Sequence, residues 1–390
     1  MPSPEAQLEI LKRGAERIIS EEELLAKLRL GRPLNIKLGV DPTAPDIHLG
    51  FTVGLTKLRQ FQDLGHHAIL IIGDFTAMIG DPSGRSKTRP QLNHDQVMSN
   101  AKTFQQQAFK ILDPARTRTV FNGQWFEMMS FAQVMQLNSR VTLQQMLQRE
   151  DFKNRVERSE AVHLHELQYP IMQGWDSVMV KADVELGGTD QLFNILVGRD
   201  LQKEEGQPQQ VVFLLPLLEG LNGGDKMSKS LGNYVGVNEP PGEMFGKLMS
   251  ISDDLMGRYY TLLLGEDQPA GHPMDAKKQL ARRIVGRYHS AEAGHAALEE
   301  FNTKFSKRDV DAAEWPTVPP GDAGADLVTV VVAAFAQGYQ MPRSRGEARR
   351  LVEQGSVQLH GEKITDPKAV PMLKSGDVLR LDKTRAVRIG

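Results

Sequence analysis

The stretch NIKLGVDPTAPDIHLGFTVG, residues 35–54, decides the fold of this chain. Its first residues are apolar in the manner of a short buried strand, a turn with two prolines follows, and His48-Leu49-Gly50 opens a helical pattern. A strand that leads into a helix N-terminus collects an anion on free backbone N–H groups, and a glycine such as Gly50 lets the ligand approach closely. An ordinary strand-to-helix connection with a surface histidine accounts for this stretch equally well.

A second apolar run, AILII at residues 68–72, is typical of a parallel strand that is buried on both faces. Together with the first strand and the helix between them it forms a βαβ unit. The sequence therefore predicts an α/β fold with a Rossmann-like, doubly wound parallel sheet. Further strands are expected at the start of residues 183–191 and at 211–215, and two helices within residues 5–30.

The composition limits the possible chemistry and the compartment. The chain has 390 residues, a net charge of −2 and no cysteine. Disulfides, thiolate metal sites and cysteine nucleophiles are thereby excluded, and a cytoplasmic location is expected. No global basic charge indicates nucleic-acid binding, so any such site must be local. The amino-terminal segment lacks the apolar core of a signal peptide, no stretch is apolar enough to span a membrane, and no membrane partner is expected.

Three polar residues share one face of an apolar helix in the segment YPIMQGWD. Tyr169, Gln173 and Asp176 lie at positions i, i+4 and i+7. Such a face predicts a pocket for a small polar molecule. Pro170 suits the first turn of a helix, so Tyr169 is expected at the helix entry. Asp190, which follows two glycines at the end of an expected strand, is suited to accept ribose hydroxyls.

Two glycine-flanked basic segments are suited to bind a polyphosphate. The first contains Arg85 and Arg89, without the spacing of a P-loop. The second is the sequence KMSKS with Lys226 and Lys229, a cationic loop for a phosphate whose charge changes during a reaction. For short charge runs of this kind, a solvated surface loop is the alternative interpretation.

HLG followed later by a complete KMSKS resembles the signature pair of the class I aminoacyl-tRNA synthetases. With VDPTAPDIHLG, GDPSG, YPIMQGWD, GGTDQ and DKMSKS, the chain is similar to the bacterial tyrosyl-tRNA synthetases over residues 37–233. The resemblance implies a tyrosine–tRNA ligase that activates L-tyrosine with ATP, releases pyrophosphate and transfers tyrosine to the 3′ end of tRNA(Tyr). A tryptophanyl-type synthetase is one alternative. A non-catalytic RNA-binding protein with a synthetase-like fold is another.

The resemblance also implies partners and roles for individual residues. Mg²⁺ is expected with ATP, no tightly bound cofactor is expected, and a homodimer would form through methionine-rich helices near residues 126–149. The tyrosine site would comprise Lys37, Asp81, Tyr169, Gln173, Asp176 and Gln191. The ATP site would comprise Gly39, Asp41, His48, Gly50, Gly188, Asp190, Lys226, Met227, Ser228, Lys229 and Ser230. The residues that act on the reacting phosphates would be Thr43, His48, Arg85, Arg89, Lys226 and Lys229.

Two positions stand out against the family pattern. Phe51 replaces the usual histidine or asparagine of the first signature, which removes a polar contact near the nucleotide. Lys37 stands where one branch of the family has tyrosine, and the chain resembles a second branch with lysine. A lysine buried in a strand needs a partner, and Asp176 and Asp41 are the expected ones.

The expected domains follow from these segments. The resemblance and the composition predict a catalytic domain over 1–233 with a helical insertion at about 94–180, a helical anticodon-side domain over 234–305, a linker over 306–325 and an α+β unit over 326–390. This last unit resembles an S4-type RNA-binding domain and carries 11 Lys and Arg against 7 Asp and Glu, a net charge of about +4. Contacts to tRNA phosphates are expected from Arg343, Arg345, Arg349 and Arg350, with a solvated helix face as the alternative.

Overall fold

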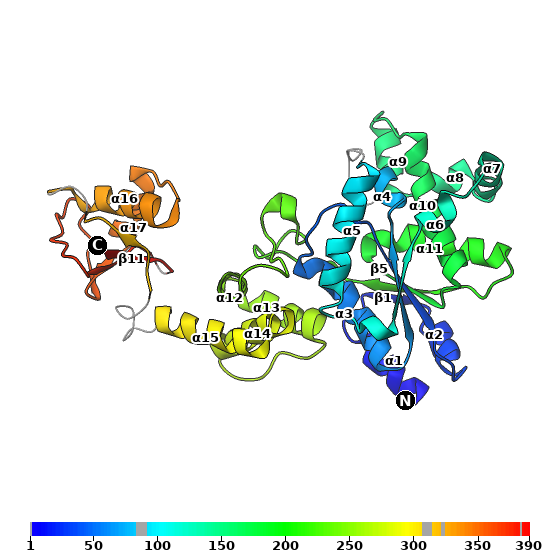
Figure 1. The fold of residues 1–390 in the computed structure, drawn as a ribbon, viewed down its shortest axis with the longest axis horizontal. Coiled ribbons are helices and arrows are strands. Elements are labelled where there is room, and N and C mark those ends of the chain that lie inside the picture. The colour runs from blue at the N-terminus through cyan, green and yellow to red at the C-terminus, as the bar shows by residue number, and fades with distance from the viewer. Residues whose placement is uncertain (1, 83–91, 306–313, 321–323, 383) are drawn as a thin grey trace. The chain divides into compact units, whose positions relative to one another are not determined.

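The computed structural model describes residues 2–82, 92–305, 314–320, 324–382 and 384–390. Contacts along the chain divide it into two compact units, Met1–Gly294 and His295–Gly390 (Figure 1). The boundary falls inside the helix Ala291–Phe305. This helix belongs to residues 234–305, the region expected as a separate helical domain. Among the helices that the structure describes, none combines the length and the apolarity needed to cross a membrane.

A six-stranded sheet forms the centre of the first unit (Figure 1). Its strand order is β1-β6-β5-β2-β3-β4, and the pairs from β6 to β4 are parallel whereas β1 runs antiparallel to β6. This is the doubly wound sheet that the sequence predicts. The strands are β1 (Arg17–Ile19), β2 (Asn35–Val40), β3 (His67–Ile72), β4 (Thr117–Phe121), β5 (Val184–Gly188) and β6 (Val211–Leu215).

Helices cover both faces of this sheet. From the centre, the crossovers β2-α3-β3 and β5-α11-β6 run in opposite directions, and right-handed connections then place α3 and α11 on opposite faces (Figure 1). Helix α10 packs along α11. The helices of this part are α1 (Pro4–Lys12), α2 (Glu21–Leu28), α3 (Leu49–Asp63), α4 (Thr76–Ile79), α5 (His94–Ala108), η1 (Pro114–Arg116), α6 (Gly123–Phe126), α7 (Phe131–Asn138), α8 (Leu143–Met146), α9 (Glu150–Glu157), α10 (Leu164–Val180), η2 (Thr189–Gln191) and α11 (Leu192–Glu204).

Two elements differ from the prediction in ways that affect the site. Strand β4 lies inside the insertion expected to be mostly helical, where it extends the sheet next to β3. Helix α10 begins before Pro170 rather than at it, so the expectation of Tyr169 at the helix entry is wrong. The helix starts earlier because the Glu166 carboxylate accepts the backbone N–H of His163 and caps the first turn. Pro170 is tolerated inside the helix although it supplies no N–H.

A helical region follows the sheet and joins it through backbone hydrogen bonds. Leu49 N–H donates to Val235 and Val237 N–H donates to Ile47, each at 2.9 Å, so the chain after KMSKS lies against the start of α3. The elements of this region are η3 (Lys229–Leu231), α12 (Pro241–Met249), α13 (Asp253–Tyr259), the π-helical turn η4 (Tyr260–Leu264), α14 (Pro273–Tyr288) and α15 (Ala291–Phe305).

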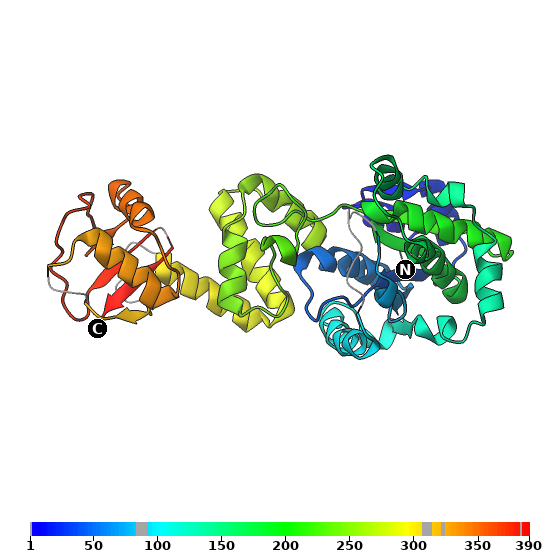
Figure 2. The ribbon, with the colours of Figure 1, turned by 90° about the horizontal axis from the view of Figure 1, so that it is seen from above.

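The second unit is a small α+β fold, in which helices lie over the strands in Figure 2. Its sheet has the strand order β7-β11-β10-β8-β9. Strand β7 lies within residues 306–325, the stretch expected as a linker, and it pairs in parallel with β11. The elements are β7 (Thr317–Val318), α16 (Leu327–Tyr339), α17 (Arg345–Glu353), β8 (Gln358–Leu359), β9 (Glu362–Lys363), β10 (Val378–Arg380) and β11 (Ala386–Ile389).

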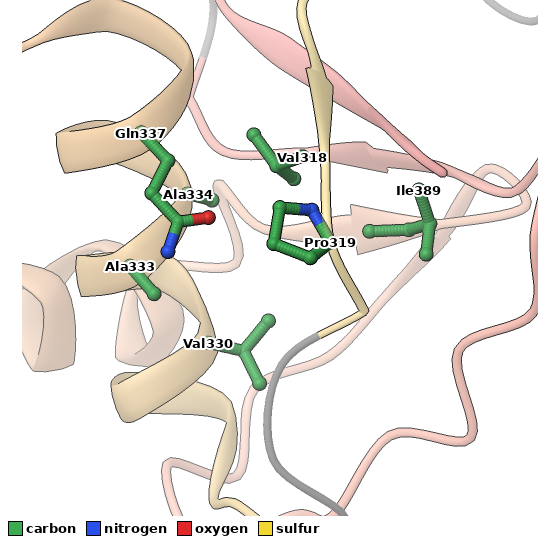
Figure 3. Close-up of a pocket in the computed structure, with 7 residues that line it drawn as sticks. All are labelled: Val318, Pro319, Val330, Ala333, Ala334, Gln337 and Ile389. Atoms are coloured by element: carbon green, nitrogen blue, oxygen red, sulfur yellow. The ribbon is translucent and has the colours of Figure 1, made fainter.

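A cavity of about 20 Å³ lies between α16, β7 and β11 of this unit (Figure 3). Apolar side chains line most of it, and Gln337 is its polar neighbour. Such a space holds about one water molecule, so it is a packing gap rather than a ligand site.

Candidate active site

Polar side chains gather where the parallel strands of the first unit end. Asp41 follows β2, Asn122 follows β4, and Asp190 follows β5. In an open parallel sheet the carboxyl ends of the strands meet at one edge, which is where such folds bind their ligands. The candidate site is built on this edge.

Asp176 is buried on α10 and both of its carboxylate oxygens accept hydrogen bonds. Trp125 Nε1–H donates at 3.0 Å and Asn122 Nδ2 donates at 3.2 Å. Burial raises the pKa of Asp176 to about 7, although the positive charge of Lys37 and the two donors oppose this shift. The group therefore changes its charge near neutral pH and can accept a hydrogen bond from a ligand hydroxyl when it is ionised.

Tyr169 and Asp41 form a second buried contact beside it. The Tyr169 hydroxyl donates to Asp41 Oδ2 at 2.9 Å, and Thr76 Oγ1 donates to Asp41 Oδ1 at 2.8 Å. Burial, followed by the negative charge of Asp41, raises the pKa of Tyr169, so its phenol stays protonated. Asn122 Nδ2 also donates to Thr76 Oγ1 at 3.0 Å and joins this contact to Asp176.

Gln173 belongs to a line of amides that leads to Asp81. Asn194 Nδ2 donates to Gln173 Oε1 at 2.8 Å and to Gln191 Oε1 at 3.2 Å. Gln191 Nε2 in turn donates to Asp81 Oδ2 at 2.9 Å. Arg149, which is also buried, donates to Asn194 Oδ1 at 3.1 Å and lies 3.7 Å from Asp81 Oδ1. The structure thus brings together three of the residues predicted for the tyrosine site.

Lys37 is buried in β2 and its ion-pair partner is Glu185 of β5, at 2.9 Å. The expectation of Asp176 or Asp41 as the partner is wrong. The sequence analysis could not identify Glu185 because the order of the strands was unknown, and β5 turns out to be the neighbour of β2 with Lys37 directly opposite Glu185.

His48 stands at the N-cap position of α3, next to the KMSKS segment, and its side chain makes no capping hydrogen bond. Its side chain is half-buried, and the buried Nδ1 has no hydrogen-bond partner among the described residues. Burial, together with the charge of Lys229, lowers the pKa of His48 to about 4, so the imidazole is neutral at physiological pH. A Cβ at Gly50 would lie 3.0 Å from this ring, which explains the glycine. Gly50 N–H points to the sulfur of Met227 at 3.3 Å.

Phe51 lies beside His48 at the surface of the site rather than inside it. Its side chain is partly exposed and its ring lies 5.1 Å from that of His48 and 6.2 Å from that of Phe104. These are ordinary distances for packed aromatic rings. The residue therefore supports the position of His48 by packing, where the family pattern has a polar side chain.

The two lysines of KMSKS lie at the same edge in long ion pairs. Lys226 Nζ lies 3.9 Å from Asp190, and Lys229 Nζ lies 4.0 Å from Asp46. The side chain of Lys226 is 50% exposed and that of Lys229 is 30% exposed. Exposed ion pairs of this geometry stabilise a protein by about 0–1 kcal/mol, so an anionic ligand can displace the carboxylate from either lysine at a small cost in free energy.

The remaining predicted residues of this unit lie on the same strand ends and loops. Gly39 is exposed near the end of β2, where a Cβ would meet nothing, and Gly188 ends β5. Thr43 N–H donates to the Asp41 carbonyl at 2.8 Å, and Ser228 N–H donates to Asn233 Oδ1 at 2.8 Å. Ser230 lies in η3. Arg85 and Arg89 lie outside the described residues.

Several residues of the site carry no motif of their own and were missed from the sequence. Asn122 and Trp125 were missed because β4 was not expected, and a polar residue directly after a strand was the signal that could have found Asn122. The missed residues are Thr76, Asn122, Trp125, Arg149, Glu185 and Asn194.

The predicted arginines of the second unit lie on and before α17. Arg343 pairs with Glu347 at 3.0 Å, Arg345 with Asp326 at 2.9 Å, and Arg349 with Glu353 at 2.9 Å. Arg350 is exposed on the same helix. These pairs are partly or largely exposed, so each arginine remains able to contact a phosphate.

Large apolar side chains are exposed in and around the insertion. Phe131 of α7 is 80% exposed and Leu164 at the start of α10 is 79% exposed, and α7 contacts α10. Met128, Met135 and Leu143 are exposed as well.

Within the described ranges, no group of three or more His, Asp and Glu side chains could hold a metal ion.

Comparison with known proteins identifies the family that this chain resembles. The family model described as tRNA synthetases class I (W and Y) matches residues 29–306. Among curated relatives, the tyrosine–tRNA ligase of Moorella thermoacetica is 47% identical, with 98% of this chain and 95% of the relative covered. That of Oleidesulfovibrio alaskensis is 49% identical, with 98% of both chains covered.

Solved structures show the same fold. The tyrosyl-tRNA synthetase of Archaeoglobus fulgidus, solved in complex with L-tyrosine, aligns with a TM-score of 0.62 over 76% of this chain and 99% of the other. The identity is 22%, so this likeness concerns the fold alone.

Proposed function

The chain belongs to the tyrosine–tRNA ligases, within the class I tRNA synthetases, and from this premise we propose how its residues carry out the reaction. Its activity is the ATP-dependent ligation of tyrosine to tRNA, as the sequence analysis expected. The full-length relatives are tyrosine rather than tryptophan ligases, which leaves the tryptophanyl alternative without support.

Asp176 is proposed to accept the hydrogen bond of the substrate phenol. The observation that carries this assignment is its burial beneath two fixed N–H donors, Trp125 and Asn122, at 3.0 and 3.2 Å. These donors hold the carboxylate in one orientation, so its remaining lone pairs have a fixed direction. A ligand without a hydroxyl would bury these remaining lone pairs without a donor, which disfavours phenylalanine.

The amino-acid end of tyrosine is proposed to bind at Asp81, Tyr169 and Gln173, with Gln191 near the carboxylate. The α-ammonium group is a donor and requires oxygen acceptors, which Asp81 and Gln173 supply. These two assignments are supported by the hydrogen bonds of Asn194 at the start of α11. Its amide donates to Gln173 and to Gln191, and Gln191 in turn donates to Asp81.

Activation of tyrosine is the attack of its carboxylate on the α-phosphorus of ATP, which releases pyrophosphate. The nucleophile is already ionised, so the residues have to position the reactants and neutralise phosphate charge rather than remove a proton. His48 is proposed to donate from a neutral ring, in line with its pKa of about 4, together with Thr43. Lys226 and Lys229 are proposed to hold the departing pyrophosphate.

The remaining nucleotide contacts are proposed from the same edge of the sheet. Gly39 and Asp41 would border the ATP, Gly50 would lie under the adenine, and Gly188 with Asp190 would bind the ribose. Met227, Ser228 and Ser230 would complete the KMSKS side of the site, and Arg85 and Arg89 would add positive charge. Mg²⁺ is proposed to arrive with ATP, held mainly by phosphate oxygens.

The second unit is proposed to bind tRNA(Tyr) as an S4-type domain. Its support is the net charge of about +4 over residues 326–390 and the arginines at α17. The enzyme is proposed to act in the cytoplasm, where tRNA is used.

A homodimer is proposed through the exposed apolar residues of α7 and the start of α10. Phe131 and Leu164 are largely exposed and lie on two helices that contact each other, and large apolar side chains exposed on neighbouring elements mark protein–protein interfaces. Light scattering should give the mass of two chains, and that of one chain for Leu164→Glu. A single-chain mass for the unmodified protein would contradict the proposal.

The experiment that tests the proposed roles is ATP–pyrophosphate exchange without tRNA, measured with tyrosine, phenylalanine and tryptophan. Exchange with tyrosine alone is expected, because Asp176 requires a hydroxyl. Exchange with phenylalanine at a comparable rate would refute the role of Asp176. No exchange with any of the three would contradict the proposed activation site. Phe51→His would then be the first substitution to test.

A further inference from the structure

A buried ion pair contacts Gln173 of the proposed amino-acid site. Lys37 and Glu185 face each other on the neighbouring strands β2 and β5 at 2.9 Å, and their side chains are 0% and 1% exposed. An ion pair at this depth costs desolvation energy that its own attraction barely returns, so its presence calls for a reason other than stability.

Lys37 uses all of its donors within the protein. Besides Glu185, its Nζ donates to the backbone carbonyl oxygen of Gln173 at 2.8 Å and to Ser177 Oγ at 2.6 Å. An ammonium group has three protons, and these three acceptors take them. Lys37 is therefore occupied by α10 and β5 and has no proton left for a substrate.

Glu185 fixes which way the amide of Gln173 points. An ionised carboxylate only accepts hydrogen bonds, and Gln173 Nε2 donates to Glu185 Oε1 at 3.1 Å. The other end of the amide, Oε1, is thereby directed away from Glu185, where Asn194 Nδ2 donates to it at 2.8 Å. A carbonyl oxygen has a second lone pair, which remains for a ligand.

The same pair is held from its far side. Ser177 Oγ donates to Glu185 Oε2 at 2.9 Å, and Gln210 Nε2 donates to the same oxygen. Both oxygens of Glu185 are thus engaged by donors of the protein, and rotation of this carboxylate would break several hydrogen bonds at once. The orientation of Gln173 is consequently set by a rigid, charged group.

We propose that Lys37 and Glu185 are a positioning pair that presents the carbonyl oxygen of Gln173, rather than its amide nitrogen, to the α-ammonium group of tyrosine. Lys37 holds the Glu185 carboxylate in place through their ion pair, Glu185 accepts from the Gln173 amide, and the amide oxygen then faces the substrate. This inference rests on the proposed function, because it takes Gln173 as a ligand of the ammonium group.

The test compares two ligands that differ only in the group concerned. L-Tyrosine carries the α-ammonium group, whereas 3-(4-hydroxyphenyl)propionate lacks it and keeps the phenol and the carboxylate. Equilibrium dialysis without ATP gives the Kd of each for the full-length protein. In Glu185→Gln, whose side chain can donate as well as accept, the Kd of tyrosine should rise about tenfold and that of the analogue should not change.

Glu166→Gln is the matched control. Glu166 also forms a buried ion pair, with Arg155 at 2.7 Å, and lies on α10 as Gln173 does. This variant should leave the ratio of the two Kd values as in the unmodified protein. A loss of both ligands to the same degree in Glu185→Gln would show a merely structural role and overturn the proposal, as would unchanged binding of both.

A second variant keeps the test decisive if Glu185→Gln does not fold. Lys37→Met/Glu185→Met removes both charges at similar volume and leaves no buried charge unpaired. The same selective loss of tyrosine is expected, because Gln173 Nε2 then lacks its acceptor. Equal binding of tyrosine by this variant and by the unmodified protein would refute the positioning role.

Gln173→Ala separates this inference from the proposed function. If Gln173→Ala binds tyrosine as the unmodified protein does, the assignment of Gln173 to the ammonium group fails, and this inference fails with it. If Gln173→Ala weakens tyrosine and spares the analogue while Glu185→Gln changes neither, the assignment stands and only the positioning pair is refuted.

Discussion

The proposed amino-acid site and the basic segments of this enzyme use charge in opposite ways. In the pocket, Asp176 and Glu185 are buried and hydrogen-bonded at 3.2 Å or less. In KMSKS, Lys226 and Lys229 are exposed or partly exposed and reach their partners only at 3.9 and 4.0 Å. The arginines around α17 form exposed pairs within their own unit.

The difference matches what each region is proposed to recognise. Tyrosine differs from phenylalanine by one hydroxyl, and a buried acceptor of fixed direction makes its absence costly. Phosphates change their charge and position during the reaction, so they are better met by cations that leave weak pairs easily. Burial and full pairing give selectivity, whereas exposure and weak pairing give charge that can move.

The largest effect is expected from removing the buried acceptor. Asp176→Ala should lower kcat/KM for tyrosine in ATP–pyrophosphate exchange about 100-fold, because a hydrogen bond to a charged group is lost and Trp125 and Asn122 are left without an acceptor. Asp200→Ala, at an exposed position of α11, is the control and should be neutral. Near-normal exchange by Asp176→Ala would show that the pocket does not read the phenol.

The next effect concerns the KMSKS lysines. Lys229→Ala should lower kcat of exchange roughly 30-fold and leave the KM of tyrosine unchanged, since the lysine acts on developing phosphate charge in a partly exposed site. Lys203→Ala, which removes an exposed lysine of α11, should have no effect. A rise in the KM of tyrosine with unchanged kcat would erase the distinction between the two regions.

A pH series sharpens the comparison within the pocket. Because the pKa of Asp176 is raised to about 7, the group is protonated at pH 6 and ionised at pH 8. Only the ionised form accepts freely from the phenol, so the Kd of tyrosine should fall about tenfold from pH 6 to pH 8. In Asp176→Asn this dependence should vanish. A flat profile in the unmodified enzyme would mean that Asp176 stays ionised throughout.

The smallest effect is expected from the arginines of the second unit. The double variant Arg349→Ala and Arg350→Ala should raise the KM for tRNA about threefold to tenfold, because two phosphate contacts are lost from a larger interface. Tyrosyl-adenylate formation without tRNA should be unaffected, which makes exchange the internal control. An equal loss in exchange and in tRNA charging would argue against an RNA role for α17.

The predicted residues of the site differ in how far the sequence could place them. Tyr169, Gln173 and Asp176 were predicted from helical spacing, and the structure places all three on α10, although that helix starts earlier than expected. Asp81 and Gln191 came from the family resemblance, and their hydrogen bond joins segments far apart in the chain. Neither spacing nor resemblance indicated Asn194, whose amide joins Gln173 to Gln191.

The sequence by itself determined the class of fold, the family and the reaction, because these depend on local patterns. An apolar run followed by a glycine-rich turn, or HLG paired with KMSKS, can be recognised without knowing what lies beside it. The fold and the tyrosine–tRNA ligase activity are confirmed by the relatives of this chain.

Only the tertiary structure decided the partners of the buried charges. Period-two alternation places Lys37 on one face of its strand, but its partner depends on which strand lies next to β2 and in which register. That neighbour is β5, which comes more than a hundred residues later and sets Glu185 opposite Lys37. The donors of Asp176 likewise come from the end of β4 and from α6, whose positions follow from sheet assembly and not from any local spacing.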